Sequence, residues 1–238
     1  MLSREEILLA NLKDVQRSLE DACRRAGKDP KAVTLLAVTK YACDKDVLTL
    51  LKTGEITDVA ESRVQQALAR WRDNPAFRNF PTVRKHFIGH LQKNKAAKAA
   101  QFFDFIDALD DFETAHILNA HVPAGKIVRT LVQVKLTDKQ TQSGLPLEKA
   151  RQLVAQLKEA AFSRLRVCGY MAIAPRVSAD GLRPLFQTVR DAFEKDFPSS
   201  QERWLSLGMS EDFTVAVEEG STLPRIGSRL FAKDLEEA

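Results

Sequence analysis

The sequence has few cysteines and none of the patterns that cysteines form in disulfide or metal sites. Its 238 residues include three cysteines, Cys23, Cys43 and Cys168, which are isolated from one another and odd in number. No Cys-x-x-Cys pair occurs, and no histidine stands at ligand spacing from a cysteine. The pattern argues against a disulfide scaffold and a zinc module, and it predicts reduced thiols in a cytoplasmic protein.

The chain also lacks a long apolar run, a block of one charge and a linker. No stretch approaches the roughly 18 apolar residues of a membrane span. Lys and Arg number 36 against 32 Asp and Glu, and the two signs alternate, which disfavours a nucleic-acid surface. No Pro/Gly/Ser tract, low-complexity segment or internal repeat is present. We expect a soluble protein that binds neither membranes nor nucleic acid.

Residues 3–25 predict an amphipathic helix. Ser3 and Glu6 have the spacing of a capping box, and Gly27 is placed to end the helix. The apolar residues between them recur at helical spacing; they are Ile7, Leu8, Val15, Leu19 and Ala22.

Eight short apolar runs are spaced along the rest of the chain, and each of the first seven precedes a helix-like stretch. They lie near residues 33–38, 56–60, 86–89, 105–109, 127–134, 165–173, 203–207 and 223–226. Regular alternation predicts a parallel sheet with helices outside, and eight units in 238 residues favour a closed (β/α)₈ TIM barrel, with residues 1–238 as a single domain. Little length follows the eighth run, so no full helix is expected after it. The N-terminal helix is expected to take the place of this eighth outer helix.

Chemistry is expected where the predicted strands end. Lys40 follows the first run, and the C-terminal ends of barrel strands face the active-site mouth. Lys40 is either a solvated lysine that begins a loop or a desolvated amine that forms a Schiff base with a carbonyl. After the seventh and eighth runs, residues 206–210 and 225–228 contain glycines that allow backbone N–H groups to approach an anion. Ser210 also has the placement of a helix N-cap.

A lysine on the first strand beside an anion cup on the last two suits a phosphorylated aldehyde such as pyridoxal 5′-phosphate (PLP). Five stretches carry a closer resemblance, namely "LLAVTK" (35–40), "HFIGHLQKNK" (86–95), "GYMAIAP" (169–175), "LSLGMSEDFTVAVEEG" (205–220) and "RIGSRLF" (225–231). With these stretches in this order, the sequence resembles the pyridoxal phosphate homeostasis protein family, single-domain relatives of the alanine racemase barrel.

The resemblance implies an α/β barrel of the alanine racemase N-terminal-domain type, with an extra N-terminal helix, that holds PLP as a Schiff base on Lys40. Phosphate and ring would lie near Ser206, Met209, Arg225, Gly227 and Ser228, with Ser210 in the phosphate cup and Ile88 and His90 lining the cofactor from the third strand. Spacing leaves open whether Arg225 meets the pyridine nitrogen or the phosphate. For His90, a packing or capping role before a helix at 92–101 is as open as contact with the cofactor.

Three places depart from the family pattern. Residues 59–63 keep the family's acid as Glu61 but lose its glycine, asparagine and aromatic residue. Residues 135–142 differ as well, and Lys85 stands where the family commonly has a tryptophan. Ser62 stands where the family has an asparagine, and it would be a shorter contact to the cofactor. Gln142 stands where the family has a lysine, an amine that could assist handover of PLP.

The expected function is that of a non-enzymatic PLP carrier in PLP homeostasis, a monomer that transiently contacts PLP-dependent apo-enzymes. The alternative is an amino-acid racemase-like PLP enzyme, which needs acid/base groups on both faces of the substrate Cα. Racemases take one such group from a second domain, for which residues after 231 leave no length. Tyr41 is the phenol nearest to Lys40 in sequence, and strand alternation predicts that it points away. A third possibility is a cofactor-free, aldolase-like barrel that forms Schiff bases with sugar phosphates.

Overall fold

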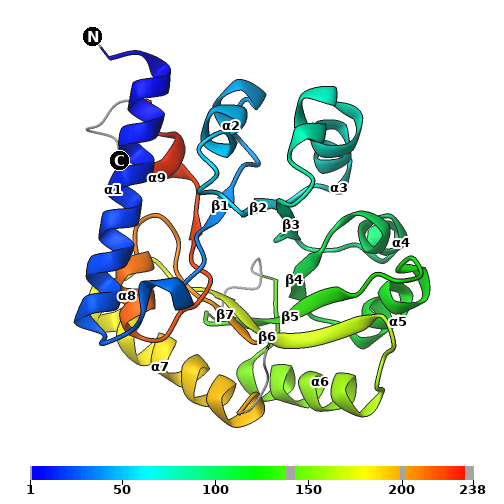
Figure 1. Ribbon diagram of the computed structural model, residues 1–238. Helices are drawn as coiled ribbons and strands as arrows, with labels where there is room; N and C mark the ends of the chain where they lie inside the picture. Colours follow the sequence, from blue (N-terminus) through cyan, green and yellow to red (C-terminus); the bar gives the residue numbers. More distant parts are fainter. Residues whose placement is uncertain (1, 138–142, 199–201, 234–238) are drawn as a thin grey trace.

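The strands form one parallel sheet that curves into a barrel, as the computed structural model shows for residues 2–137, 143–198 and 202–233 (Figure 1). Neighbouring strands follow the order β7-β6-β5-β4-β3-β2-β1-β8. Their bounds are β1 (Leu36–Val38), β2 (Asp58–Glu61), β3 (Arg84–Phe87), β4 (Phe105–Leu109), β5 (Val128–Lys135), β6 (Leu165–Ile173), β7 (Trp204–Ser206) and β8 (Arg225–Ile226). Each strand overlaps one predicted apolar run, so the expected TIM barrel is confirmed.

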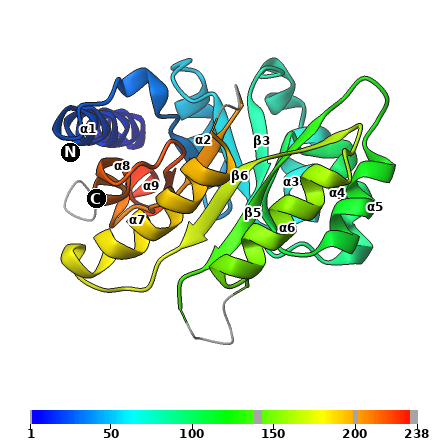
Figure 2. The same ribbon diagram turned by 90° about the horizontal axis from the view of Figure 1, so that it is seen from below.

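A helix follows every strand, and the helices lie outside the barrel (Figures 1 and 2). They are α1 (Arg4–Arg25), α2 (Asp44–Leu51), α3 (Val64–Ala67), α4 (Lys93–Phe102), α5 (Phe112–His121), α6 (Leu147–Glu159), α7 (Ala179–Asp196), α8 (Phe213–Glu218) and α9 (Ser228–Phe231), with short turns η1 (Pro30–Ala32), η2 (Leu68–Asp73) and η3 (Pro75–Asn79). Phe103, Phe186 and Phe193 are fully buried between strands and helices, and each contributes on the order of 2–3 kcal/mol by apolar burial. None of the described helices is long and apolar enough to cross a membrane.

The N-terminal helix α1 begins and ends as predicted. The Glu6 N–H donates to Ser3 Oγ at 3.2 Å, and the Ser3 N–H donates to Glu6 Oε2 at 2.7 Å. Gly27 takes a φ of +64°, a left-handed conformation that costs glycine little. Because α9 is only one turn long, α1 packs against both α8 and α9 and covers the position of an eighth helix (Figure 1).

The barrel closes at the seam between β7 and β8 through individual hydrogen bonds. On its other side β8 pairs regularly with β1, in parallel register. Across the seam the Arg225 N–H donates to the Gly208 carbonyl at 3.0 Å, and Ser206 Oγ donates to the Leu223 carbonyl at 2.8 Å. The Arg225 guanidinium adds bonds to Ser206 and, on β6, to the Ala172 carbonyl, each at 2.8 Å. One arginine thus joins β8 to both β7 and β6.

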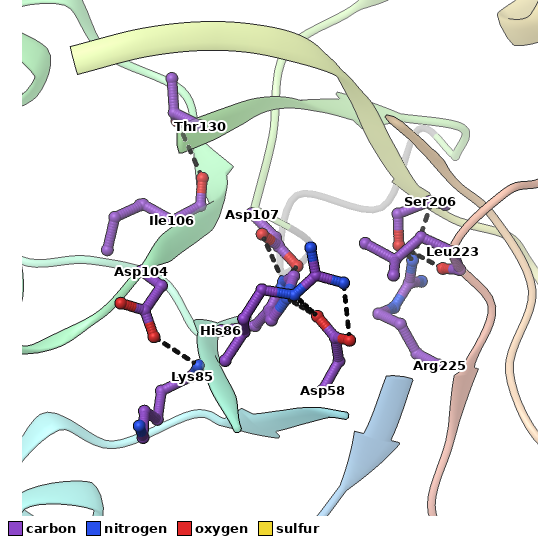
Figure 3. Close-up of polar contacts among 11 residues, drawn as sticks. Asp58, Lys85, His86, Asp104, Ile106, Asp107, Thr130, Ser206, Leu223 and Arg225 are labelled. Carbon is purple, nitrogen blue, oxygen red and sulfur yellow. Dashed lines mark hydrogen bonds and ion pairs between the residues drawn. The ribbon is translucent and has the colours of Figure 1, made fainter. Parts of the chain in front are cut away.

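The barrel interior combines apolar side chains, among them Leu36, Leu131 and Met171, with a charged cluster. His86 on β3 lies between Asp107 on β4 and Asp58 on β2 (Figure 3). His86 Nδ1 is 2.9 Å from Asp107 Oδ2, and Nε2 is 2.9 Å from Asp58 Oδ1. Arg84 binds both oxygens of Asp58, with Nε 2.8 Å from Oδ1 and Nη2 2.8 Å from Oδ2. Both imidazole nitrogens face carboxylates, so both donate and the ring is held as a cation.

The electrostatics of His86 agree with this geometry. Burial disfavours the charged ring, but the carboxylates of Asp107 and Asp58 outweigh burial and raise the pKa of His86 to about 9. The ring also stacks on Phe105 at a centroid distance of 4.1 Å. An imidazolium whose folded pKa exceeds its unfolded pKa stabilises the native state below the unfolded value, and this stabilisation is lost as pH rises through the folded value.

We therefore predict that His86→Gln lowers the free energy of unfolding by about 3 kcal/mol at pH 7, because it leaves two buried carboxylates without their cation. In urea unfolding of the unmodified chain, stability should decline as pH rises from 6.5 through about 9. The variant should lack that component of the decline. His116→Gln, at an exposed position on α5, is the control. Parallel pH profiles for the unmodified chain and His86→Gln would contradict a charged His86.

Candidate functional site

The C-terminal ends of the strands open into a cavity of about 1180 Å³. Parallel strands all end at this side, so residues distant in sequence meet there. Most of the predicted site residues line this one cavity, namely Lys40, Ile88, Met209, Ser210, Arg225, Gly227 and Ser228. The cavity therefore combines an amine with hydroxyl and backbone donors.

Lys40 lies in a turn directly after β1. The Ala42 N–H donates to the Thr39 carbonyl at 3.0 Å, which reverses the chain and leaves Lys40 half-buried on the cavity wall. Within residues 2–137, 143–198 and 202–233, no carboxylate oxygen lies within 4.0 Å of Lys40 Nζ. Its amine is therefore not committed to an ion pair in the described part of the chain.

The predicted orientation of Tyr41 is wrong. Lys40 Nζ lies 5.0 Å from the centroid of the Tyr41 ring, although that side chain is 88% exposed. The strand ends at Val38, so Lys40 and Tyr41 lie in a turn and the alternation of strand side chains does not apply to them. The structure thus places a phenol beside the amine.

An anion cup lies across the same cavity from Lys40, at the end of β8. It consists of Ser210, Gly227, Ser228 and the backbone N–H of Arg229. Ser210 Oγ accepts hydrogen bonds from the Gly227 N–H at 3.2 Å and from the Arg229 N–H at 3.4 Å. The prediction that Ser210 caps the following helix is wrong, because α8 begins at Phe213 with Asp212 as its N-cap. The Ser210 hydroxyl instead binds the two backbone donors at the start of α9.

Gly227 brings β8 into direct contact with β1. A Cβ atom at this position would lie 3.2 Å from both Cβ and the carbonyl oxygen of Val38. Such a contact is tighter than ordinary packing, so one strand end would have to shift. Because Val38 is two residues before Lys40, a side chain at Gly227 would disturb the amine and the cup together.

Arg225 borders the cavity from the barrel interior. Its side chain is 4% exposed, and burial lowers its pKa to about 10, although Asp107 and Asp212 act in the opposite direction. The guanidinium therefore stays charged at neutral pH. Ser206 is fully buried and accepts a hydrogen bond from Arg225, so it acts on the cavity through that arginine (Figure 3).

Two predicted residues lie elsewhere. Ser62 and His90 line a smaller neighbouring depression of about 370 Å³, which Arg63 and Lys95 share. His90 is exposed, with Nδ1 3.8 Å from Asp110 Oδ2. The structure does not bring either residue to the cavity of Lys40, and Gln142 lies outside the described residues.

Sequence reasoning missed the residues that hold the Lys40 turn in place. Arg70 binds Glu61 and the carbonyls of Thr39 and Ala42. The available signal was Glu61, an acid retained in a segment that otherwise departs from the family pattern. Nothing in the local sequence indicated which cation it pairs with, because Arg70 follows in a separate helical segment.

Comparison with known proteins places this arrangement in a family. The model of the alanine racemase N-terminal domain matches residues 10–234. The pyridoxal phosphate homeostasis protein of Pasteurella multocida is 32% identical over 226 residues, which cover 93% of this chain and 95% of that protein.

Solved structures agree with the sequence matches. PipY of Synechococcus elongatus, solved with PLP bound, has a TM-score of 0.75 at 29% identity and covers 90% of this chain and 100% of its own. Alanine racemase of Clostridium difficile shares the fold at a TM-score of 0.64 and 13% identity, over 93% of this chain and 57% of the racemase. The chain belongs to the alanine racemase N-terminal-domain family and, within it, to the pyridoxal phosphate homeostasis proteins.

Proposed function

We propose that this protein binds PLP in the cavity between β1 and β8 and takes part in PLP homeostasis as a carrier without turnover. The observation that carries the proposal is the convergence of Lys40 and the Ser210–Gly227 cup on one cavity. Support also comes from PipY, which shares the fold over 90% of this chain and was solved with PLP bound.

Lys40 supplies the reactive group of the proposed site. Bound PLP provides an aldehyde. Lys40 Nζ would be the amine that condenses with this aldehyde, with release of water. Because no carboxylate of the described residues lies within ion-pair distance of Nζ, no such pair has to break first.

Gly227, Ser228 and Arg229 suit the phosphate of PLP. The Gly227 and Arg229 N–H groups donate to Ser210 Oγ, which leaves the Ser210 O–H to donate to a phosphate oxygen beside these backbone groups. The Ser210 and Ser228 side chains line the same cavity and add hydroxyl donors. We therefore assign the phosphate to this cup.

Arg225 is assigned to the ring side of the cofactor. Its guanidinium is buried and held by Ser206 and Ala172, apart from the backbone donors of the cup. Arginine has no acceptor, so a ring nitrogen facing it stays unprotonated and is a weak electron sink.

A racemase-like enzyme is the second candidate, and the contact between Tyr41 and Lys40 favours it. The centroid of the Tyr41 ring lies 5.0 Å from Lys40 Nζ, and its hydroxyl would serve as the second proton donor. The carrier is preferred because the relative from Pasteurella multocida, 32% identical over 93% of this chain, is named a pyridoxal phosphate homeostasis protein. Cytoplasmic location, a monomeric state and contact with apo-enzymes stay predictions.

Lys40→Ala should abolish covalent retention of PLP, because Lys40 supplies the amine. Reduction with borohydride followed by mass spectrometry should find a phosphopyridoxyl group on Lys40 in the unmodified chain and none on the variant. Lys45→Ala, at an exposed position on α2, should behave as the unmodified chain. A reduced adduct found mainly on another lysine would contradict the assignment.

Gly227→Ala should weaken PLP binding about tenfold, a loss of about 1.4 kcal/mol, because the new methyl group presses on Val38 and separates cup from amine. Fluorescence titration with PLP measures the affinity, and circular dichroism checks folding. Gly125→Ala, in the loop between α5 and β5, controls for strain at a glycine far from the cup. Unchanged affinity in a folded Gly227→Ala protein would refute this cup.

The PLP-loaded protein should show no sustained racemisation or transamination. Incubation with L-alanine in deuterium oxide should leave Cα exchange below one turnover per chain, measured by NMR and chiral chromatography. Multiple turnovers that are lost in both Lys40→Ala and Tyr41→Phe would establish the racemase-like alternative in place of the carrier.

A further inference from the structure

Arg70 holds the turn that carries Lys40, although Arg70 itself lies in a helical segment that follows the next strand, β2. It lies in η2, a π-helical stretch that follows α3, and its side chain is only 14% exposed. Widened helical turns of this kind are common at functional sites. The guanidinium has four partners, which are Thr39 O at 2.8 Å, Glu61 Oε1 at 2.7 Å, Ala42 O at 2.6 Å and Asp44 Oδ1 at 2.7 Å.

These partners surround the reactive lysine in sequence. Thr39 and Ala42 flank the pair of residues 40–41, and Asp44 begins α2. A planar guanidinium with five donors can bind all these oxygens in one fixed geometry, whereas an ammonium cannot. Arg70 therefore fixes the backbone before and after Lys40 at the same time.

Glu61 links this clamp to the sheet. Its carboxylate on β2 is 2% exposed and accepts from Arg70 and from Thr39 Oγ1 at 2.8 Å. Thr39 Oγ1 also lies 3.3 Å from the Ala60 carbonyl. The Lys40 turn is thus anchored to the second strand rather than left to its own turn hydrogen bond.

We propose that Arg70 is a positioning residue of the Lys40 site, one that orients the amine toward the carbonyl of its ligand. The inference rests on the proposed function. In the described part of the chain Arg70 is not among the residues that line the cavity, and its hydrogen-bond partners there do not include Ser210 or Gly227. It should therefore affect bond formation at Lys40 and leave recognition of the phosphate intact.

Two ligands separate these roles. PLP can form a C=N bond with Lys40, whereas pyridoxine 5′-phosphate carries an alcohol in place of the aldehyde and binds only non-covalently. Arg70→Gln should weaken PLP binding about tenfold and slow borohydride-trappable attachment, while affinity for pyridoxine 5′-phosphate stays within about twofold. Arg70→Lys should recover part of the PLP affinity at most, because it restores the charge beside Glu61 without the four-way contact.

Removal of Arg70 also leaves the Glu61 carboxylate buried without its cation, which could destabilise the chain as a whole. The double variant Glu61→Gln with Arg70→Gln removes both charges, and its PLP defect should persist with stability restored. Arg129→Gln is a matched control. Arg129 lies at the start of β5, is partly buried and forms a bidentate pair with Glu202. It should leave both affinities unchanged.

Equal losses of affinity for PLP and pyridoxine 5′-phosphate, or no loss of either, would overturn the positioning role. Hydrogen–deuterium exchange of residues 39–43 without any ligand tests the clamp independently: exchange should rise in the double variant, and unchanged exchange would overturn it. If the unmodified chain failed to retain PLP through Lys40, the proposed function itself would fall, even if the exchange result showed that the clamp exists.

Discussion

The pairing of β8 with β1 is the contact on which the candidate site depends. Lys40 follows β1 and the anion cup follows β8, so the two meet only because these strands are neighbours. The last strand is only two residues long, and regular pairing alone would hold it weakly. Arg225 compensates by binding β7 and β6 from inside the barrel. The buried side chain of Arg225 therefore adds to the backbone and Ser206 hydrogen bonds that close the barrel and assemble the site.

Charge inside the barrel is arranged as a connected cluster. Arg84, Asp58, His86 and Asp107 alternate in sign, and the field of Asp107 also acts on Arg225 (Figure 3). A set of well-packed apolar residues would often stabilise a core as much as buried ions do. The cluster fixes geometry instead, since each member has a partner of opposite charge and removing one leaves its neighbour buried and unpaired. Arg225, on which the field of Asp107 acts, is a permanent cation at the edge of the cavity.

The candidate site places its reactive amine on a loop and its supports on secondary structure. The turn after β1 has little core of its own, because Tyr41 and Cys43 are exposed and Lys40 is half-buried. Rigidity comes from outside the turn, through Arg70 on η2 and Glu61 on β2. A protein that retains an aldehyde needs this amine and the anion cup, whereas turnover needs further acid/base groups on the opposite face of a substrate. Tyr41, beside Lys40, is the described residue by which turnover can be tested.

Local patterns were sufficient for the fold. The strand runs, the capping box of Ser3 and Glu6 and the stop at Gly27 are all determined by residues close together in sequence, and regular alternation implies a parallel barrel. The motifs around Lys40 and Gly227 likewise pointed to the end of the barrel where both lie. Contacts between distant segments were decided by the tertiary structure. Ser210 turned toward α9 instead of capping α8, and Tyr41 turned toward Lys40, because a partner elsewhere in the chain or an early strand end outweighed the local preference. The His86 cluster and the Arg70 clamp join side chains from separate strands and helical segments, and only closure of the barrel brings their charges within hydrogen-bonding distance.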